Sequence, residues 1–197
     1  MKDVFVPGSS VFTPPEVSAY TKEWIEKLEK GKSSAVRFAI SAMDDYFAPM
    51  NAGQLCAVIA QTSHYKSGFL HSWERQLANQ LMRDGRTDEC VVHVSIEESV
   101  EEQGILMLAI ESGEDSQKLA RGDVMDWAKL KRAAVTIGTV PIFRIGDALA
   151  RPEDSPHLYM SNMIRAVHYL ESKDKVVENR LFRDKPLKIA ALFFDYL

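Results

Sequence analysis

The stretch AVIAQTSHYKSGFL, residues 57–70, joins two segments with different hydrophobic patterns. Residues 55–60, LCAVIA, form a short apolar run typical of a parallel strand covered on both faces. The polar residues that follow lead to Lys66 and Ser67. Beyond them the apolar residues have helical spacing, as in Phe69, Leu70, Trp73, Leu77 and Leu81. The stretch therefore predicts a buried strand, a polar loop and a helix in direct succession.

The same alternation continues to residue 197. Further strand-like runs are CVVHVSIE (90–97), VPIFRIG (140–146) and LKIAALFFDYL (187–197). Helical patterns separate them, in SVEEQGILMLAIESG (99–113), VMDWAKLKRAAVTIG (124–138) and YMSNMIRAVHYLESKDK (159–175). Repeated strand-helix alternation predicts an α/β fold in which helices flank a mostly parallel sheet.

Residues 1–32 precede this pattern and read as an extended arm followed by an amphipathic helix. Thr13 is a candidate N-cap, Pro14 suits the first helical position, Glu16 completes a capping box, and Gly31 is a stop signal. We therefore predict a helix over residues 14–30. Its apolar residues fall on one face: Val17, Tyr20, Trp24, Ile25 and Leu28. This face packs either on its own domain or on a neighbouring subunit, and the sequence leaves both open.

Composition narrows the class of protein. The 197 residues are 46% hydrophobic and 26% charged, as in an ordinary globular domain. A formal net charge of -4 gives no general attraction to nucleic acid, so such binding needs a local basic patch or an assembled ring. Cys56 and Cys90 lie in apolar runs without metal-ligand spacing, which predicts core residues in a reducing compartment. With no membrane-span or signal-peptide pattern, we expect a cytoplasmic protein with no membrane partner.

Lys66 and Ser67 occupy the position of the lysine and hydroxyl of a phosphate-binding loop. In such a loop backbone N–H groups and a helix N-terminus surround the phosphates, the lysine reaches them, and the hydroxyl holds Mg²⁺. The sequence AQTSHYKS fits GxxxxGK[ST] only at this pair, because Ala60 and Tyr65 replace the two glycines. Lys-Ser at a strand-to-helix junction also arises by chance, so the motif alone decides nothing.

Two carboxylates follow other predicted strands. Glu97 ends the run HVSIE and Asp195 ends LFFD, and open α/β sheets bind ligands at the carboxyl edge of their strands. Both would then converge with Lys66 on one site. The alternatives are a helix N-terminal carboxylate for Glu97 and a solvated chain end for Asp195. His93, inside a strand-like run, is interpreted as a hydrogen-bonded core residue.

Four segments in matching order resemble DnaB-type replicative helicases. They are MNAGQLCAVIAQTSHYKSGF (50–69), VVHVSIEESVEEQ (91–103), LARGDVMDWAKL (119–130) and ALFFDYL (191–197). The first is similar to the family's turn, first strand and phosphate loop, the second to its Ser-Leu-Glu-Met-Ser strand end. The third is similar to its helix entry with glycine and tryptophan, and the fourth to its Ile-Asp-Tyr-Leu strand. The helix predicted over 14–30 corresponds to the family's linker helix, which packs on the adjacent subunit of a ring.

The resemblance implies a RecA-like P-loop NTPase fold over residues 33–197 that couples ATP hydrolysis to movement along single-stranded DNA. It implies ATP and Mg²⁺ as ligands and a homo-oligomeric ring. Carried over by position, Lys66 contacts phosphate, Glu97 activates the attacking water, and Ser67 and Asp195 hold the metal. The residues that would contact the nucleotide are Ala60, Gln61, Thr62, Ser63, His64, Tyr65, Lys66 and Ser67.

The chain departs from that pattern at Tyr65, where the family has glycine. If the position needs a positive φ, tyrosine costs about 1–2 kcal/mol. The family also continues beyond the strand that ends FFDYL, so we expect a fragment of a longer protein. Two other functions remain open. One is a RecA-like scaffold that has lost ATP binding through Tyr65, and the other is a recombination-type or clock-type RecA relative.

Overall fold

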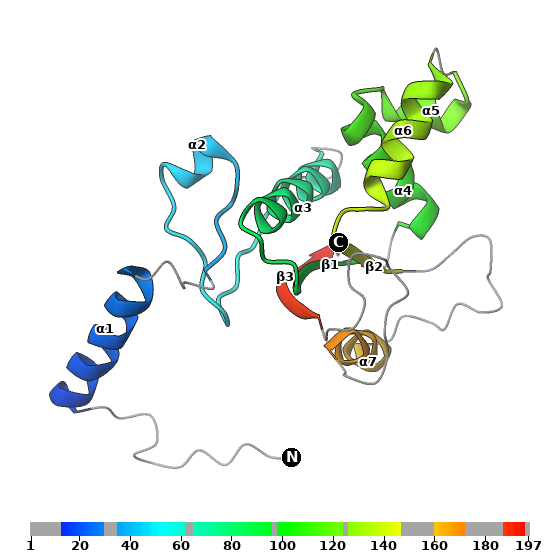
Figure 1. Ribbon diagram of the computed structural model, residues 1–197. Helices are drawn as coiled ribbons and strands as arrows, with labels where there is room; N and C mark the ends of the chain where they lie inside the picture. Colours follow the sequence, from blue (N-terminus) through cyan, green and yellow to red (C-terminus); the bar gives the residue numbers. More distant parts are fainter. Residues whose placement is uncertain are drawn as a thin grey trace. The chain divides into compact units, whose positions relative to one another are not determined.

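The computed structural model describes residues 13–29, 35–61, 65–95, 98–123, 126–146, 160–171 and 187–195 (Figure 1). The chain divides into two compact units, Met1–Ala35 and Val36–Leu197. Each unit is described by itself.

The described part of the first unit, residues 13–29 and Ala35, contains the helix α1 (Pro14–Glu29). The Glu16 carboxylate accepts hydrogen bonds from the Thr13 backbone N–H and hydroxyl, both at 2.7 Å, as the capping pattern predicts. These bonds hold the pKa of Glu16 below its usual value. The apolar face of α1 is exposed in this unit, with Tyr20 at 60% and Trp24 at 52%.

The second unit is built on a small parallel sheet. Its strands are β1 (Glu89–Ser95), β2 (Ile142–Ile145) and β3 (Lys188–Asp195), in the order β2-β1-β3. β1 lies between the other two and is parallel to both, so all three strands end at the same edge. Ser95 of β1 pairs with Asp195 of β3 at that edge. The predicted α/β class with a parallel sheet flanked by helices is confirmed at this level.

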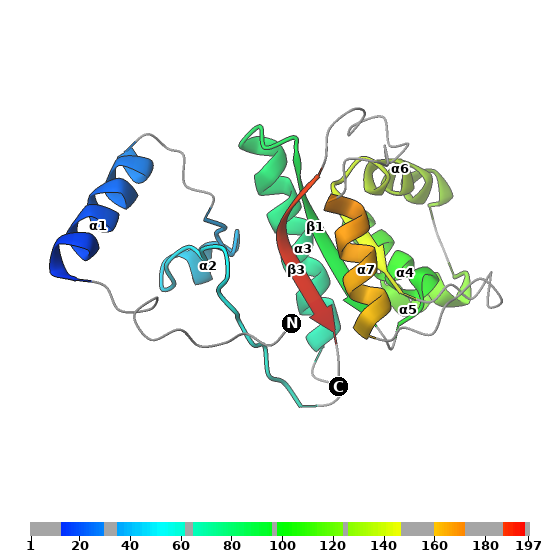
Figure 2. The ribbon, with the colours of Figure 1, turned by 90° about the horizontal axis from the view of Figure 1, so that it is seen from below.

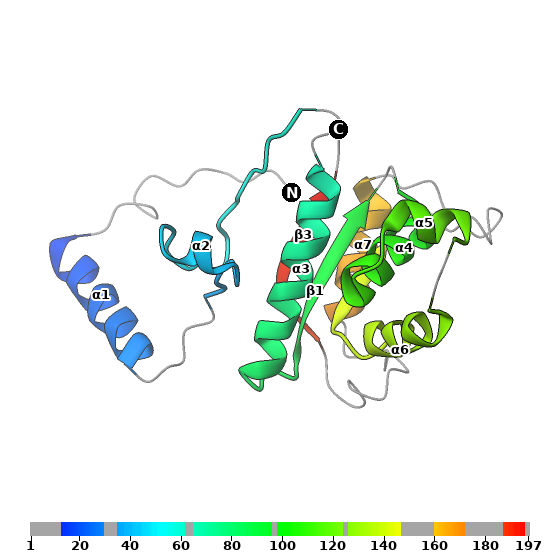
Figure 3. The same ribbon diagram turned by 90° about the horizontal axis from the view of Figure 1, so that it is seen from above.

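Helices cover both faces of the sheet. Figures 2 and 3 show α3 (Lys66–Arg83) on one face and α7 (Met160–Glu171) on the other. The core beneath α3 includes Val91 and Phe193, and the second core, with Val92 and Val94, packs against Leu170 of α7. The remaining helices are α2 (Ser41–Asp44), α4 (Val100–Ser112), α5 (Ser116–Arg121) and α6 (Trp127–Ile137).

The predicted strand at residues 55–60 is wrong. The segment has no regular secondary structure, and Leu55 and Ile59 are 94% and 93% exposed. Cys56 is exposed as well, whereas Cys90 is buried as predicted. Within the described residues β3 pairs with β1 alone, so the segment lacks the ladder that a strand requires. Phe38, which precedes this segment, belongs to the core beneath α3. Its ring stacks on that of Trp73, with ring centroids 4.8 Å apart.

The described residues include no helix that combines the length and the apolar character needed to span a bilayer.

Candidate functional site

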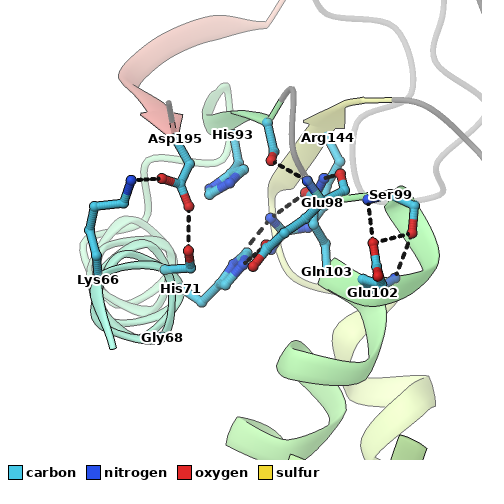
Figure 4. Close-up of polar contacts among 12 residues, drawn as sticks. Lys66, Gly68, His71, His93, Glu98, Ser99, Glu102, Gln103, Arg144 and Asp195 are labelled. Atoms are coloured by element: carbon cyan, nitrogen blue, oxygen red, sulfur yellow. Dashed lines mark hydrogen bonds and ion pairs between the residues drawn. The ribbon is translucent and has the colours of Figure 1, made fainter. Parts of the chain in front are cut away.

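Lys66 and Asp195 meet at the carboxyl edge of the sheet (Figure 4), and Ser67 bonds to Asp195 there. Lys66 Nζ lies 2.7 Å from Asp195 Oδ1, and the Ser67 hydroxyl donates a hydrogen bond of 2.6 Å to Asp195 Oδ2. The lysine and the aspartate are far apart in the sequence, so the fold brings them together. The structure therefore joins three of the residues that the sequence assigns to one site.

Local structure explains why these groups face one another. α3 begins at Lys66, so its first turn presents both the ammonium group and the Ser67 hydroxyl. Asp195 is the last residue of β3 and is only 1% exposed. The free N–H groups at the start of an α-helix and its dipole favour an anion at this position. The edge thus combines a cation, a hydroxyl, a carboxylate and a helix N-terminus.

Tyr65 precedes α3 in the left-handed conformation, with φ 59° and ψ 31°. This is a region that glycine adopts freely and that costs other L-residues about 1–2 kcal/mol. The expected cost at Tyr65 is therefore present. The tyrosine ring lies against Gly68, where an added Cβ would come within 2.1 Å of a ring carbon. Because Gly68 has no side chain, it leaves room for the Tyr65 ring at the start of α3.

Asp195 is held as a carboxylate. Burial alone would raise the pKa of Asp195, but the ion pair with Lys66 and the hydrogen bond from Ser67 outweigh burial and hold that pKa below its usual value. A negatively charged oxygen pair beside a hydroxyl is a donor set that suits Mg²⁺. The residues present therefore fit the predicted metal.

The remaining predicted site residues have no described contact with this group. Ala60 and Gln61 belong to the irregular, exposed segment that precedes α3. Thr62, Ser63, His64 and Glu97 lie outside the described residues. Their assignment to nucleotide or water stays a prediction from the resemblance.

A second cluster of polar groups lies next to this edge, and the sequence did not predict it. Glu74, fully buried on α3, accepts hydrogen bonds from His71 Nδ1 at 2.8 Å and from His93 Nδ1 at 2.7 Å. Arg144 of β2 donates a further bond to the same carboxylate. His71 also reaches Glu98 through Nε2, at 3.1 Å. The two imidazole rings stack with centroids 4.7 Å apart.

Basic and acidic side chains meet in this cluster. Burial alone would raise the pKa of Glu74, but the two histidines and Arg144 outweigh burial and lower that pKa to about 2. Burial would lower the pKa of His71, yet its bonds with Glu74 and Glu98 outweigh burial and raise that pKa. His71 and Arg144 both contact carboxylates of this cluster. His93 Nε2 is buried and has no hydrogen-bond partner among the described residues.

The nitrogen and oxygen atoms of His71, Glu74 and His93 lie within 4.8 Å of one another and could in principle hold a metal ion. Arg144 already contacts the shared carboxylate and supplies the positive charge that such an ion would bring. Burying a divalent ion beside a guanidinium would also be costly. We therefore interpret the cluster as a buried polar network around Glu74.

A weak signal for this network exists in the sequence. His71 and Glu74 are three positions apart on the same helical face as Leu70, Trp73 and Leu77, so polar residues fall on a buried stripe. His93 was interpreted as a hydrogen-bonded core residue, and its bond to Glu74 confirms that interpretation. The partner could not be named, because β1 and α3 meet only in the folded chain.

Comparisons with known proteins add no name to this site. The chain matches no protein-family model, and a search of curated proteins finds no match either.

Proposed function

We propose that the chain is a Mg·ATP-binding, ATP-hydrolysing domain with a RecA-like P-loop NTPase fold, of the DnaB-type helicase class that acts in DNA replication. The contact of Lys66 and Ser67 with Asp195 carries this proposal. It unites a lysine, a hydroxyl and an acidic strand end at a helix N-terminus, the arrangement that binds nucleotide phosphates and their metal. The resemblance of four segments to the helicase family supports the choice of class.

Each residue has a defined task in this proposal. Lys66, whose side chain is 17% exposed, leaves Asp195 and pairs with phosphate oxygens when a nucleotide binds. The Ser67 hydroxyl and the Asp195 carboxylate would hold the metal. Mg²⁺, when bound, neutralises charge on the phosphate oxygens. Glu97 remains the candidate for activating water, by its place in the resemblance.

Assembly through α1 belongs to the same proposal. Val17, Tyr20, Trp24 and Ile25 expose 44–60% of their surface on one helix, and a second copy of this chain is the proposed occupant, as in the ring of the resembling family. Single-stranded DNA would then bind to the assembled ring, which can concentrate the basic groups that the net charge of -4 does not provide. A cytoplasmic location is part of the same proposal.

Trp24→Lys should convert an assembled protein into monomer, because it places a charge on the apolar face of α1. Light scattering coupled to size-exclusion chromatography measures the mass directly. Lys22→Ala, a change of an exposed side chain on the same helix, should leave the wild-type mass unchanged. A monomeric wild-type chain, or a Trp24→Lys variant with the wild-type mass, would contradict assembly through α1.

A RecA-like scaffold without ATP binding is the second candidate function, and the geometry of Tyr65 favours it. Tyr65 has a positive φ and carries a bulky side chain at the position where the backbone of a phosphate-binding loop must approach phosphate closely. The ring of Tyr65 lies against Gly68, in the first turn of α3. Calorimetry of Mg·ATP binding by the wild-type chain separates the ATPase from the scaffold. Heat of binding supports the ATPase, and no heat at high protein concentration supports the scaffold.

Tyr65→Gly should bind Mg·ATP about tenfold more tightly than the wild-type chain, a gain of about 1.4 kcal/mol. Removing the Cβ and the ring opens the approach to the first turn of α3, and glycine adopts φ 59° without strain. The same calorimetric titration measures the change. Tyr65→Phe, which keeps the ring and the strain, should match the wild-type affinity. Equal or weaker binding by Tyr65→Gly would show that Tyr65 does not obstruct the site.

A further inference from the structure

One face of α3 contacts all three strands in turn. Ser67, in the first turn, bonds to Asp195 of β3. His71, one turn later, bonds to Glu98 in the loop between β1 and α4. Glu74, three residues further, bonds to His93 of β1 and Arg144 of β2. The helix that offers Lys66 and Ser67 at its start is thus tied by its own side chains to the loop that follows β1.

Glu98 is held at three of its polar groups. Its backbone N–H donates to Ser95 Oγ at 3.0 Å, and its backbone oxygen accepts a bond of 3.0 Å from Gln103 Nε2. Its carboxylate meets His71 Nε2 (Figure 4). Of these three bonds, only the last comes from α3. His71 therefore links the helix to the side chain of Glu98.

The surroundings reinforce that link. Gln103 Oε1 accepts a bond of 3.0 Å from Arg144, which also bonds to Glu74. At Gly146 an added Cβ would lie 3.0 Å from Gln103 Nε2 and 3.6 Å from the Glu98 backbone oxygen, so the loop packs closely on the segment after β2. The network thus forms a closed path from His71 through Glu98, Gln103 and Arg144 to Glu74 and back to His71. A closed path of bonds fixes a loop more firmly than one contact does.

We propose that His71 is a positioning residue, which fixes the loop residues Glu98 and Ser99, just before α4, relative to the start of α3 through its hydrogen bond with Glu98. The proposal rests on the proposed function, in which the start of α3 holds the nucleotide phosphates. ATP turnover then depends on His71, because Glu98 and the start of α3 must keep one relative geometry during the reaction. His71 is 0% exposed and touches Glu74 and Glu98, so it acts through them and not on the nucleotide.

The variant that tests this is His71→Gln, with Glu98→Gln and the double variant beside it. Amide hydrogen exchange of Glu98 and Ser99 in the nucleotide-free chain should be at least about tenfold faster in His71→Gln, because the loop opens more often. With Mg·ATP, kcat should fall by about tenfold or more while the dissociation constant for Mg·ATP changes by less than about twofold. The double variant should be no worse than the worse single variant, since both remove one interaction.

His168→Gln is the matched control, because it makes the same chemical change at an exposed position of α7 and should alter neither readout. Unchanged exchange in His71→Gln would overturn the proposal, and so would faster exchange with wild-type kcat. An equal loss of kcat and of Mg·ATP affinity would also overturn it, because that pattern marks general damage to the site. A wild-type chain that binds no Mg·ATP would refute the proposed function and reduce His71 to a structural residue. Because exchange is measured without nucleotide, these two failures are distinguishable.

Discussion

Glu74→Gln should lower the free energy of unfolding by about 3 kcal/mol, since breaking a buried ion pair by removing one partner typically costs about 3–5 kcal/mol. Glu74 is 0% exposed and is shared by His71, His93 and Arg144. Glutamine keeps the volume of the side chain but leaves the partly buried Arg144 guanidinium without its carboxylate. Urea denaturation at pH 7, followed by tryptophan fluorescence, measures the loss.

The pH dependence of stability gives an independent check of the same group. The pKa of Glu74 is lowered to about 2 in the folded chain, against an ordinary value of 4.5. A lowered pKa means that the contribution of Glu74 is fully present above about pH 4.5 and is lost as the pH falls towards 2. The difference in stability between wild-type and Glu74→Gln should therefore shrink as the pH falls from about 4.5 towards 2.

Glu114→Gln is the control for Glu74→Gln. This substitution breaks the ion pair between Glu114 and Lys129, whose side chains are 26% and 41% exposed respectively. It should lower the free energy of unfolding by at most about 1 kcal/mol. A loss in Glu74→Gln no larger than that of Glu114→Gln would show that the buried network does not stabilise the fold.

Local patterns predicted much of this fold because they act within a few residues. The contact of Glu16 with Thr13 follows from a spacing that any helix start reproduces. The helix from Lys66 follows from its apolar stripe, and the burial of Asp195 follows from a carboxylate behind an apolar strand. The resemblance then placed Lys66, Ser67 and Asp195 together, and their contact agrees with that expectation.

Residues 55–60 show where local patterns do not suffice. An apolar run predicts a strand only if the fold supplies a neighbour for its backbone, and the described sheet pairs β3 with β1 alone. The network around Glu74 was missed for a related reason. Its members come from α3, β1, β2 and the loop at Glu98, and a single sequence does not show which buried polar groups will meet.

Lys66→Ala should weaken Mg·ATP binding by about 100-fold or more, which takes it beyond detection if the wild-type affinity is micromolar. Lys66 is the cation at the start of α3, and charge-assisted hydrogen bonds to phosphate contribute about 1.5–3 kcal/mol each. Alanine removes them all. Isothermal titration of Mg·ATP into both proteins at the same ionic strength measures the loss.

Folding and binding must be separated in this test, because Lys66 also pairs with the buried Asp195. Lys66→Arg keeps a positive charge for Asp195, so it should retain more stability than Lys66→Ala, but its planar guanidinium cannot replace the ammonium as a point contact to phosphate. We therefore expect weak nucleotide binding by both variants. Lys129→Ala removes a lysine of the exposed pair with Glu114 and should bind as the wild-type chain does. Wild-type affinity in a folded Lys66→Ala variant would mean that any nucleotide binds elsewhere, and the contact of Lys66 with Asp195 would then be a structural ion pair.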